Sequence, residues 1–217
     1  MQFDQFDLVV ERLRIALKHP LPGPAAQAVM SPRPRRQWPE GFNPAHVRHA
    51  AGLLLLYPID GRAHIVLTVR TDTVRHGGQV SMPGGVAEPG ETYEQAALRE
   101  AREEVGLAPQ TVNVLGPLTA LDIPASGFRL HPILGFVTER PRLTPADAEV
   151  ARILEVGIAA LVEPERRVKI SIARSDRTIL APAFRIGGAD VWGATAMVLA
   201  EFLALVEFRE SSNQLGS

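Results

Sequence analysis

The sequence has 217 residues, of which 46% are hydrophobic and 22% charged, with a formal net charge of −1 and no cysteine. This balance is typical of a soluble globular protein with enough length for a sizeable core. The lack of cysteine excludes disulfides, thiolate metal ligands and cysteine nucleophiles, and it fits a reducing compartment. The near-zero charge provides no basic field for nucleic acid or an anionic membrane, so neither is expected as a partner.

The sequence predicts neither a targeting segment nor a membrane segment. Its first residues are acidic and lack the charged-then-apolar layout of a signal peptide. The longest apolar stretch, Ala194 to Val206, contains Glu201 and is too short to span a bilayer. We therefore expect a cytoplasmic protein.

The first part of the chain predicts a helix followed by irregular structure. Apolar residues recur at helical spacing from Phe3 to Leu17. A proline-rich stretch follows from Pro20 to Pro39, and it should run as an extended arm over the surface. Its arginines, Arg33, Arg35 and Arg36, fit a solvated basic loop better than a phosphate-binding arm. We assign residues 1–45 to an N-terminal helix and proline-rich extension, 46–210 to one α/β domain, and 211–217 to a tail.

The domain itself begins with two apolar runs, 51–57 and 64–69, and Asp60-Gly61 between them predicts a β-hairpin. Residues 71–90 should be loop, and a helix is expected from Thr92 to Val105. Strands are predicted at 111–115, 118–123 and 129–137, with a short strand or turn in 147–156 and a short helix at 158–162. A second hairpin is predicted at 167–186. The closing helix, Trp192 to Phe208, is apolar nearly all round and should be buried in the core or in a subunit contact.

One helix carries the chemistry. Thr92 followed by Gln95 is a capping box that starts it, and Gly106 suits a left-handed C-terminal cap. Glu100, Glu103 and Glu104 are spaced i, i+3 and i+4, so they share one face. Their apolar neighbours, such as Ala97, Ala101 and Val105, lie on another face that can be buried.

Carboxylates gathered in this way repel one another unless a cation lies among them. Hard oxygen ligands suit Mg²⁺ or Mn²⁺, which also takes phosphate oxygens as ligands and activates water. Gly84 and Gly85 let backbone N–H groups approach a phosphate closely, and Arg99 can pair with Glu91 to brace the loop. The ordinary alternative is a solvated helix with i,i+4 ion pairs. The full pattern of fixed residues, however, should coincide by chance on the order of once in 10⁶ chains.

The pattern resembles the Nudix box. Its fixed positions here are Gly85, Glu91, Arg99, Glu100, Glu103, Glu104 and Gly106. The resemblance implies an α/β fold, a Nudix-type α/β/α sandwich with a mixed β-sheet and a loop-helix-loop catalytic motif. It also implies that Glu100, Glu103 and Glu104 bind the metal, that Glu91 and Gly106 are structural, and that Glu103 or a glutamate outside the box helps to deprotonate water.

A wider resemblance points to the coenzyme A pyrophosphatase branch of that family. It rests on residues 67–71 and 78–85, on 124–128 and 131–135, and on Glu149-Val150 and 191–196. The sequence departs from the branch in three places: the segment between Arg70 and His76 is one residue short, and Met82 and Thr71 stand where Phe and Ser are usual. By this resemblance Glu149 is the additional carboxylate.

We assign Glu103, Glu149 and Arg99 to catalysis, and we assign Arg70, His76, Gln79, Gly84 and Gly85 to substrate binding. Each has an ordinary alternative: Arg70 as a surface ion pair, His76 as a solvated loop residue, Gln79 as a turn cap and Glu149 as a surface glutamate. Trp192 suits a core anchor and His131 a structural role.

The sequence therefore predicts a Mg²⁺- or Mn²⁺-dependent hydrolase of a small-molecule diphosphate. The resemblance favours coenzyme A or acyl-CoA, giving 3′,5′-ADP and 4′-phosphopantetheine. ADP-ribose or another nucleoside diphosphate derivative is the alternative substrate. A non-catalytic binding module is disfavoured because the box glutamates are all present. A homodimer is a further expectation from the resemblance, and the apolar C-terminal helix fits it.

Overall fold

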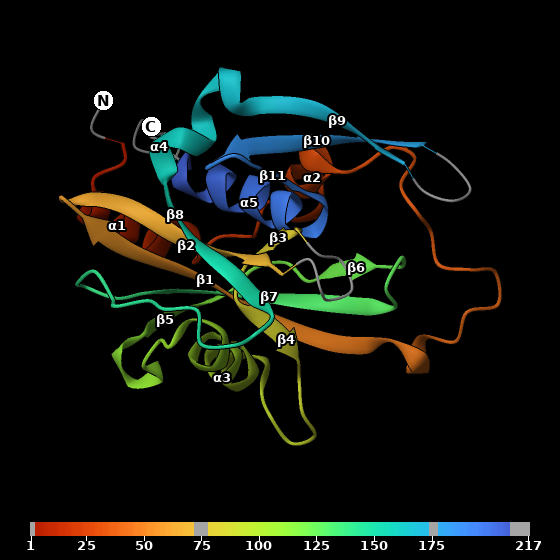
Figure 1. Ribbon diagram of the computed structural model, residues 1–217, viewed down its shortest axis with the longest axis horizontal. Coiled ribbons are helices and arrows are strands. Elements are labelled where there is room, and N and C mark those ends of the chain that lie inside the picture. The colour runs from red at the N-terminus through yellow and green to blue at the C-terminus, as the bar shows by residue number, and fades with distance from the viewer. Residues whose placement is uncertain (1–2, 72–77, 174–177, 209–217) are drawn as a thin grey trace, which may run out of the picture.

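The computed structural model describes residues 3–71, 78–173 and 178–208. It contains an eight-stranded mixed sheet, here sheet A, and a three-stranded antiparallel sheet, here sheet B (Figure 1). The helices are α1 (Phe6–Ala16), α2 (Gly23–Gln27), α3 (Tyr93–Val105), α4 (Ile158–Val162) and α5 (Gly193–Val206). Short 3-10 turns lie at Ala28–Met30, Pro44–His46, Pro109–Thr111 and Pro164–Arg166. The strands of sheet A are β1 (Arg48–Ile59), β2 (Arg62–Arg70), β3 (Val80–Ser81), β4 (Gly84–Val86), β5 (Asn113–Pro117), β6 (Leu121–Ile123), β7 (Phe128–Phe136) and β8 (Val150–Gly157), and those of sheet B are β9 (Arg167–Ala173), β10 (Thr178–Ile186) and β11 (Ala189–Trp192).

Strand β1 is the centre of sheet A. It runs parallel to β7 and antiparallel to β2, and its first half also pairs with β4. Residues Leu53 to Tyr57 have no exposed area, because both faces of this strand are covered. Such a continuous apolar run is expected of a strand buried on two sides.

Two hydrophobic clusters lie on the two faces of sheet A. On one face, Leu53, Leu55 and Tyr57 pack with the alanines of α3. On the other, Leu54 and Leu56 join a larger cluster that includes side chains from α1 and α5. The α/β/α sandwich expected from the sequence is therefore confirmed. Sheet B lies beyond α5, on the side away from α3 (Figure 1).

Most expected elements are confirmed. The first hairpin turns at Asp60 and Gly61, whose φ angles of 48° and 71° are those of a tight type I′ turn. The capped helix, the short helix at 158–162, the hairpin within 167–186 and the buried closing helix are all present. The strand expected in 147–156 is longer than a short segment, since β8 pairs along β2 from His64 to Arg70.

Three expectations were wrong in part. The proline-rich stretch is not an extended arm throughout, because residues 23–30 form α2 and a 3-10 turn, and Gln27 and Met30 in them are buried. Residues 71–90 are not all loop, since β3 and β4 lie within them. Strand β11 occupies the residues before α5, so that helix begins at Gly193.

A buried carboxylate explains why the proline-rich stretch folds back. Glu201 of α5 has no exposed area and accepts hydrogen bonds from three groups. These are the backbone N–H of Gly23 (3.2 Å), the side-chain amide of Gln27 (2.9 Å) and the backbone N–H of Thr119 (3.2 Å). A buried charge needs such partners, so Glu201 fastens α2 and the segment between β5 and β6 to α5. In the described part of the chain, no helix is both long enough and apolar enough to cross a membrane.

Candidate active site

The helix that carries the three glutamates, α3, is fixed at both ends as the sequence predicted. The Thr92 hydroxyl accepts from the backbone N–H of Gln95 (3.2 Å), and the Gln95 side chain accepts from the backbone N–H of Thr92 (2.8 Å). Gly106 ends the helix in the left-handed region with φ 70°. Both ends are thus specified locally, which sets the rotation and length of the helix.

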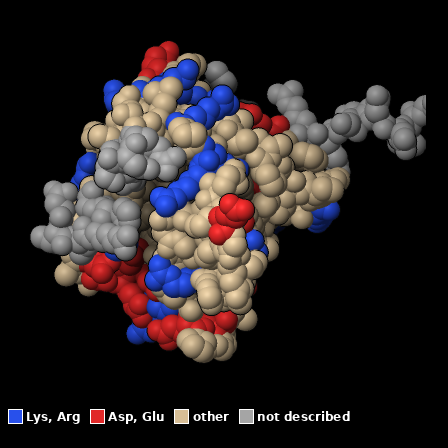
Figure 2. Space-filling view, turned by 90° about the vertical axis from the view of Figure 1, so that its right-hand side faces the viewer, with Lys and Arg blue, Asp and Glu red and all other residues tan. Residues whose placement is uncertain are grey.

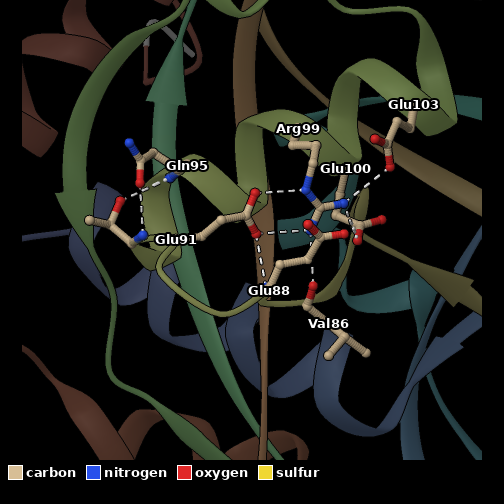
Figure 3. Close-up of polar contacts among 8 residues, drawn as sticks. Val86, Glu88, Glu91, Gln95, Arg99, Glu100 and Glu103 are labelled. Carbon is tan, nitrogen blue, oxygen red and sulfur yellow. Dashed lines mark hydrogen bonds and ion pairs between the residues drawn. The ribbon is translucent and has the colours of Figure 1, made fainter.

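Arg99 joins the preceding loop to the helix (Figure 3). Its guanidinium donates to both carboxylate oxygens of Glu91 (2.8 and 3.1 Å) and to the Val86 carbonyl (3.0 Å). It also donates to Glu100 (2.9 Å) and Glu103 (3.1 Å). The predicted Arg99–Glu91 brace is therefore present. The hydrogen bonds that Glu91 accepts from Arg99, together with one from the backbone N–H of Glu88, lower the pKa of Glu91 below its ordinary value.

The three helix glutamates differ in their surroundings. The side chain of Glu103 is 54% exposed and that of Glu100 is 17% exposed, while Glu104 as a whole residue is 6% exposed. Burial raises the pKa of the Glu100 carboxyl, and it raises the pKa of Glu104 to about 7. Desolvation penalises the charged form of both groups, so each is stabilised by a cation placed beside it.

Two consecutive glycines in β4 contact these carboxylates. The backbone N–H of Gly84 donates to Glu104 (3.2 Å). A Cβ on Gly85 would lie 2.4 Å from Oε1 of Glu100, and one on Gly84 would lie 2.4 Å from the Ala51 carbonyl of β1. At Gly84 the obstructing atoms are backbone, whereas at Gly85 they are the end of the Glu100 side chain, which would have to move.

Glu149, the carboxylate expected from outside the box, pairs with Arg70. Arg70 ends β2, and the backbone N–H of Thr71 donates to the Glu149 carbonyl (2.8 Å). The Arg70 guanidinium also lowers the pKa of Glu104, although burial outweighs it. Its buried Nε has no hydrogen-bond partner among the residues described. The structure therefore brings Arg70 and Glu149 together, beside the buried end of the α3 face.

For the remaining predicted site residues, the structure describes fewer contacts. His76 lies outside the described residues. Gln79 is hydrogen-bonded to Arg70 through main-chain atoms, because the Gln79 carbonyl accepts from the Arg70 N–H (3.0 Å). Asp147 was not among the site residues predicted from the sequence. Its side chain accepts a hydrogen bond from the Glu149 N–H (3.0 Å), and its charge raises the pKa of Glu104. The Asp-x-Glu spacing could have indicated this turn.

A histidine–tyrosine cluster adjoins the start of α3, of which only a structural role for His131 was predicted. The His49 Nδ1 lies 2.9 Å from His131 Nε2 and 3.0 Å from the Tyr93 hydroxyl. The Tyr93 and His131 rings stack with centroids 3.5 Å apart. Burial lowers the pKa of His131 to about 4, which keeps it neutral at neutral pH. The cluster fastens the first turn of α3 to β1 and β7.

The face drawn in Figure 2 carries both acidic and basic side chains, and they are partly separated. Asp and Glu side chains gather along the lower margin of the face in Figure 2, at the level of α3 and the loop before it. Lys and Arg side chains lie above them across the middle of the face.

The donor set fits a hard divalent ion by its chemistry. Glu100 and Glu104 are desolvated carboxylates with raised pKa values, and Glu103 adds a third oxygen donor on the same helix. As the side chains stand, no group of three or more His, Asp or Glu residues within the described ranges forms a ready ion site. Arg99, bound to both Glu100 and Glu103, occupies part of their hydrogen-bonding capacity.

Comparisons with known proteins agree with this geometry. The family model of the NUDIX domain matches residues 47–170. The uncharacterized Nudix hydrolase NudL from Pectobacterium atrosepticum is 32% identical over 165 residues, which are 75% of this chain and 85% of that protein. Nudix hydrolase 3 of Caenorhabditis elegans is 29% identical over 171 residues, which are 71% of each chain.

A solved structure shows the same fold. A MutT/nudix family protein from Enterococcus faecalis superposes with a TM-score of 0.51 at 18% identity, over 79% of this chain and 65% of that one. Nudix hydrolases generally use divalent metal ions and act on small molecules. The chain belongs to the Nudix hydrolase family, whose members hydrolyse phosphorus-containing anhydrides.

Proposed function

We propose that this protein hydrolyses the diphosphate of coenzyme A or acyl-CoA with Mg²⁺ or Mn²⁺, releasing 3′,5′-ADP and 4′-phosphopantetheine or its acyl form. The observation that carries the chemistry is the buried Glu104 carboxylate beside Glu100, with Arg70 and Glu149 next to it. The choice of coenzyme A rests on the resemblance of residues 67–85 to the segment typical of that branch.

Glu100, Glu103 and Glu104 are the proposed metal ligands. When bound, the ion would polarise water and offset negative charge at phosphorus. The chain supplies the remaining groups. Arg99 holds Glu100 and Glu103 against the loop, and the Gly84 N–H holds Glu104.

Proton transfer falls to Glu103 or Glu149 in this proposal. Water attacks one phosphorus of the diphosphate, the bridging P–O bond breaks, and the leaving phosphate keeps the electron pair. The water proton passes to the carboxylate, for which Glu103 is suited by its exposure and Glu149 by the orientation that Arg70 imposes. The exposed part of the Arg70 guanidinium is the proposed phosphate contact, since the side chain is 28% exposed.

A substrate panel tests the proposal. We expect purified protein with Mg²⁺ or Mn²⁺ to release 3′,5′-ADP from coenzyme A and acetyl-CoA faster than it cleaves ADP-ribose or a dinucleoside polyphosphate, measured by product chromatography. Turnover of another substrate with no 3′,5′-ADP would refute the coenzyme A assignment and leave the hydrolase assignment intact.

A matched pair of variants tests the site. Glu103→Gln should lower kcat by about 10²-fold or more while leaving the melting temperature nearly unchanged, because the side chain is exposed. Glu94→Gln makes the same chemical change in the exposed first turn of α3 and should keep full activity. Equal activity in both variants would show that the role of Glu103 is misassigned.

A further inference from the structure

Glu149 lies directly before β8, at the end where the pairing of β8 with β2 becomes irregular. Val69 pairs with Arg152, but the pairing then skips a residue, so that Arg70 pairs with Val150. A β-bulge of this kind redirects the side chains beside it, and bulges are over-represented next to active sites. The regular ladder of sheet A therefore does not by itself fix the direction of the Glu149 side chain.

The ion pair with Arg70 is not a sufficient restraint on Glu149 either. The side chain of Glu149 is 47% exposed and that of Arg70 is 28% exposed. An ion pair in contact with water is screened, and holding two long side chains in one geometry costs conformational entropy. The direction of the Glu149 carboxylate therefore depends on how the backbone beneath it is held.

Both main-chain groups of Glu149 are hydrogen-bonded, each to a different part of the chain. Its carbonyl accepts from the backbone N–H of Thr71, just after β2 (2.8 Å). Its N–H donates to Oδ1 of the Asp147 side chain (3.0 Å). The Asp147 carbonyl accepts from the backbone N–H of Val150 (3.1 Å), which closes a tight turn around Glu149. Asp147 therefore fixes the backbone of Glu149 on the side away from β2.

The residues before this turn are attached to the helix that carries the proposed metal ligands. The backbone N–H of Ala146 donates to the Glu104 carbonyl (3.0 Å), and that of Thr144 donates to the Val105 carbonyl (3.1 Å). Both carbonyls belong to the last turn of α3, where no further helical N–H is available to them. The Asp147 carboxylate is also close enough to Glu104 for its charge to raise the pKa of Glu104. Residues 144–149 thus form a short link between the end of α3 and Glu149.

We propose that Asp147 is a positioning residue for the hydrolysis. Through its hydrogen bond to the Glu149 N–H, it holds the Glu149 carboxylate beside Arg70 and the α3 glutamates, in the direction that proton transfer requires. The inference rests on the role proposed above for Glu149, and it does not depend on which diphosphate is the substrate. Asp147 acts through Glu149 and is assigned no contact with substrate.

Steady-state kinetics on the best substrate of the panel test this role. Asp147→Ala removes the acceptor and should lower kcat about 10-fold while changing KM less than about 2-fold, because misplacing a catalytic group slows the reaction more than it weakens binding. Asp147→Asn keeps an oxygen acceptor at the same place without the charge, so it should recover most of the lost kcat. Glu139→Ala is the matched control, since it removes an exposed carboxylate from the same connection between β7 and β8 and should keep full activity.

A double-mutant cycle shows whether Asp147 acts through Glu149. In a Glu149→Gln background, Asp147→Ala should change kcat by less than about 2-fold, because no carboxylate is left to position. A full loss in that background, or equal losses of kcat in Asp147→Asn and Asp147→Ala, would overturn the proposal. If Glu149→Gln has no measurable turnover, the comparison of the Asn and Ala variants decides.

The two single variants also separate this inference from the proposed function. Wild-type kcat in Glu149→Gln would overturn both the role proposed for Glu149 and the positioning role of Asp147. Loss of kcat in Glu149→Gln beside full activity in Asp147→Ala would overturn the positioning role alone. Thermal melts establish that each variant folds. If Asp147→Ala does not, Asp147→Glu, which displaces the acceptor by one methylene group, replaces it in every comparison.

Discussion

Substitution of Gly85 by alanine is the sharpest test of how the loop supports the helix carboxylates. The new Cβ would lie 2.4 to 2.6 Å from all three atoms of the Glu100 carboxylate group. Non-bonded atoms need about 3.4 Å, so the carboxylate must retreat by about 1 Å. The hydrogen bond of 2.9 Å that this carboxylate now accepts from Arg99 would have to readjust.

The expected cost falls on catalysis rather than on folding. Misplacement of a catalytic group by about 1 Å can lower the rate about 10²-fold. The obstructing atoms belong to the end of a flexible side chain, so the free energy of unfolding should change by no more than about 1 kcal/mol. Initial rates with saturating Mg²⁺, together with chemical denaturation, measure the two quantities separately.

Two neighbouring glycines serve as controls. A Cβ on Gly52 would meet its nearest atom at 3.5 Å, an ordinary contact, so Gly52→Ala should keep activity and stability. A Cβ on Gly84 would meet backbone atoms of β1 at 2.4 and 2.6 Å, so Gly84→Ala should destabilise the fold itself. Wild-type turnover in Gly85→Ala would refute the idea that Glu100 must stay in its present place.

Three further outcomes are expected. Glu201→Ala should lower the free energy of unfolding by about 3 kcal/mol, because it leaves buried donors without an acceptor, whereas the exposed Glu207→Ala should not; urea denaturation measures both. The unfolded chain protonates His131 near pH 6.5 and the folded chain only near pH 4, so stability should fall by about 1–2 kcal/mol as pH drops through that window. In the His131→Phe variant, stability should depend less on pH between about 6.5 and 4. Unfolding midpoints of both proteins at these two pH values test this, and an equal drop in the variant would contradict it. Gly106→Ala should cost about 1 kcal/mol, because φ is 70° there, and Gly106→Asn should cost less; similar melting temperatures for the two variants would contradict this.

Local signals account for what the sequence predicted well. The hairpin at Asp60-Gly61 and the capped helix from Thr92 are specified by residues adjacent in the chain, so no tertiary information was needed. Helical periodicity alone predicted that the three helix glutamates share one face. The spacing of residues in the Nudix box predicted the contact between Arg99 and Glu91.

Tertiary contacts account for what it missed. Helix α2 lies among prolines and is held by Glu201, 178 residues away from Gly23. The pairing of His49 with His131 depends on β1 and β7 being parallel neighbours, which neither strand reveals separately. The unequal burial of the three helix glutamates likewise depends on β4, not on the helix sequence.

The shared guanidinium of Arg99 has a consequence for how this loop can evolve. Glu91, Glu100 and Glu103 all accept hydrogen bonds from one side chain, so loss of any of them releases a donor that the others can take up. Substitutions at these positions should therefore be strongly epistatic in double-mutant cycles. A substitution tolerated at one acceptor alters which substitutions are tolerated at the other two. Arg99 and its three acceptors should therefore diverge together or hardly at all.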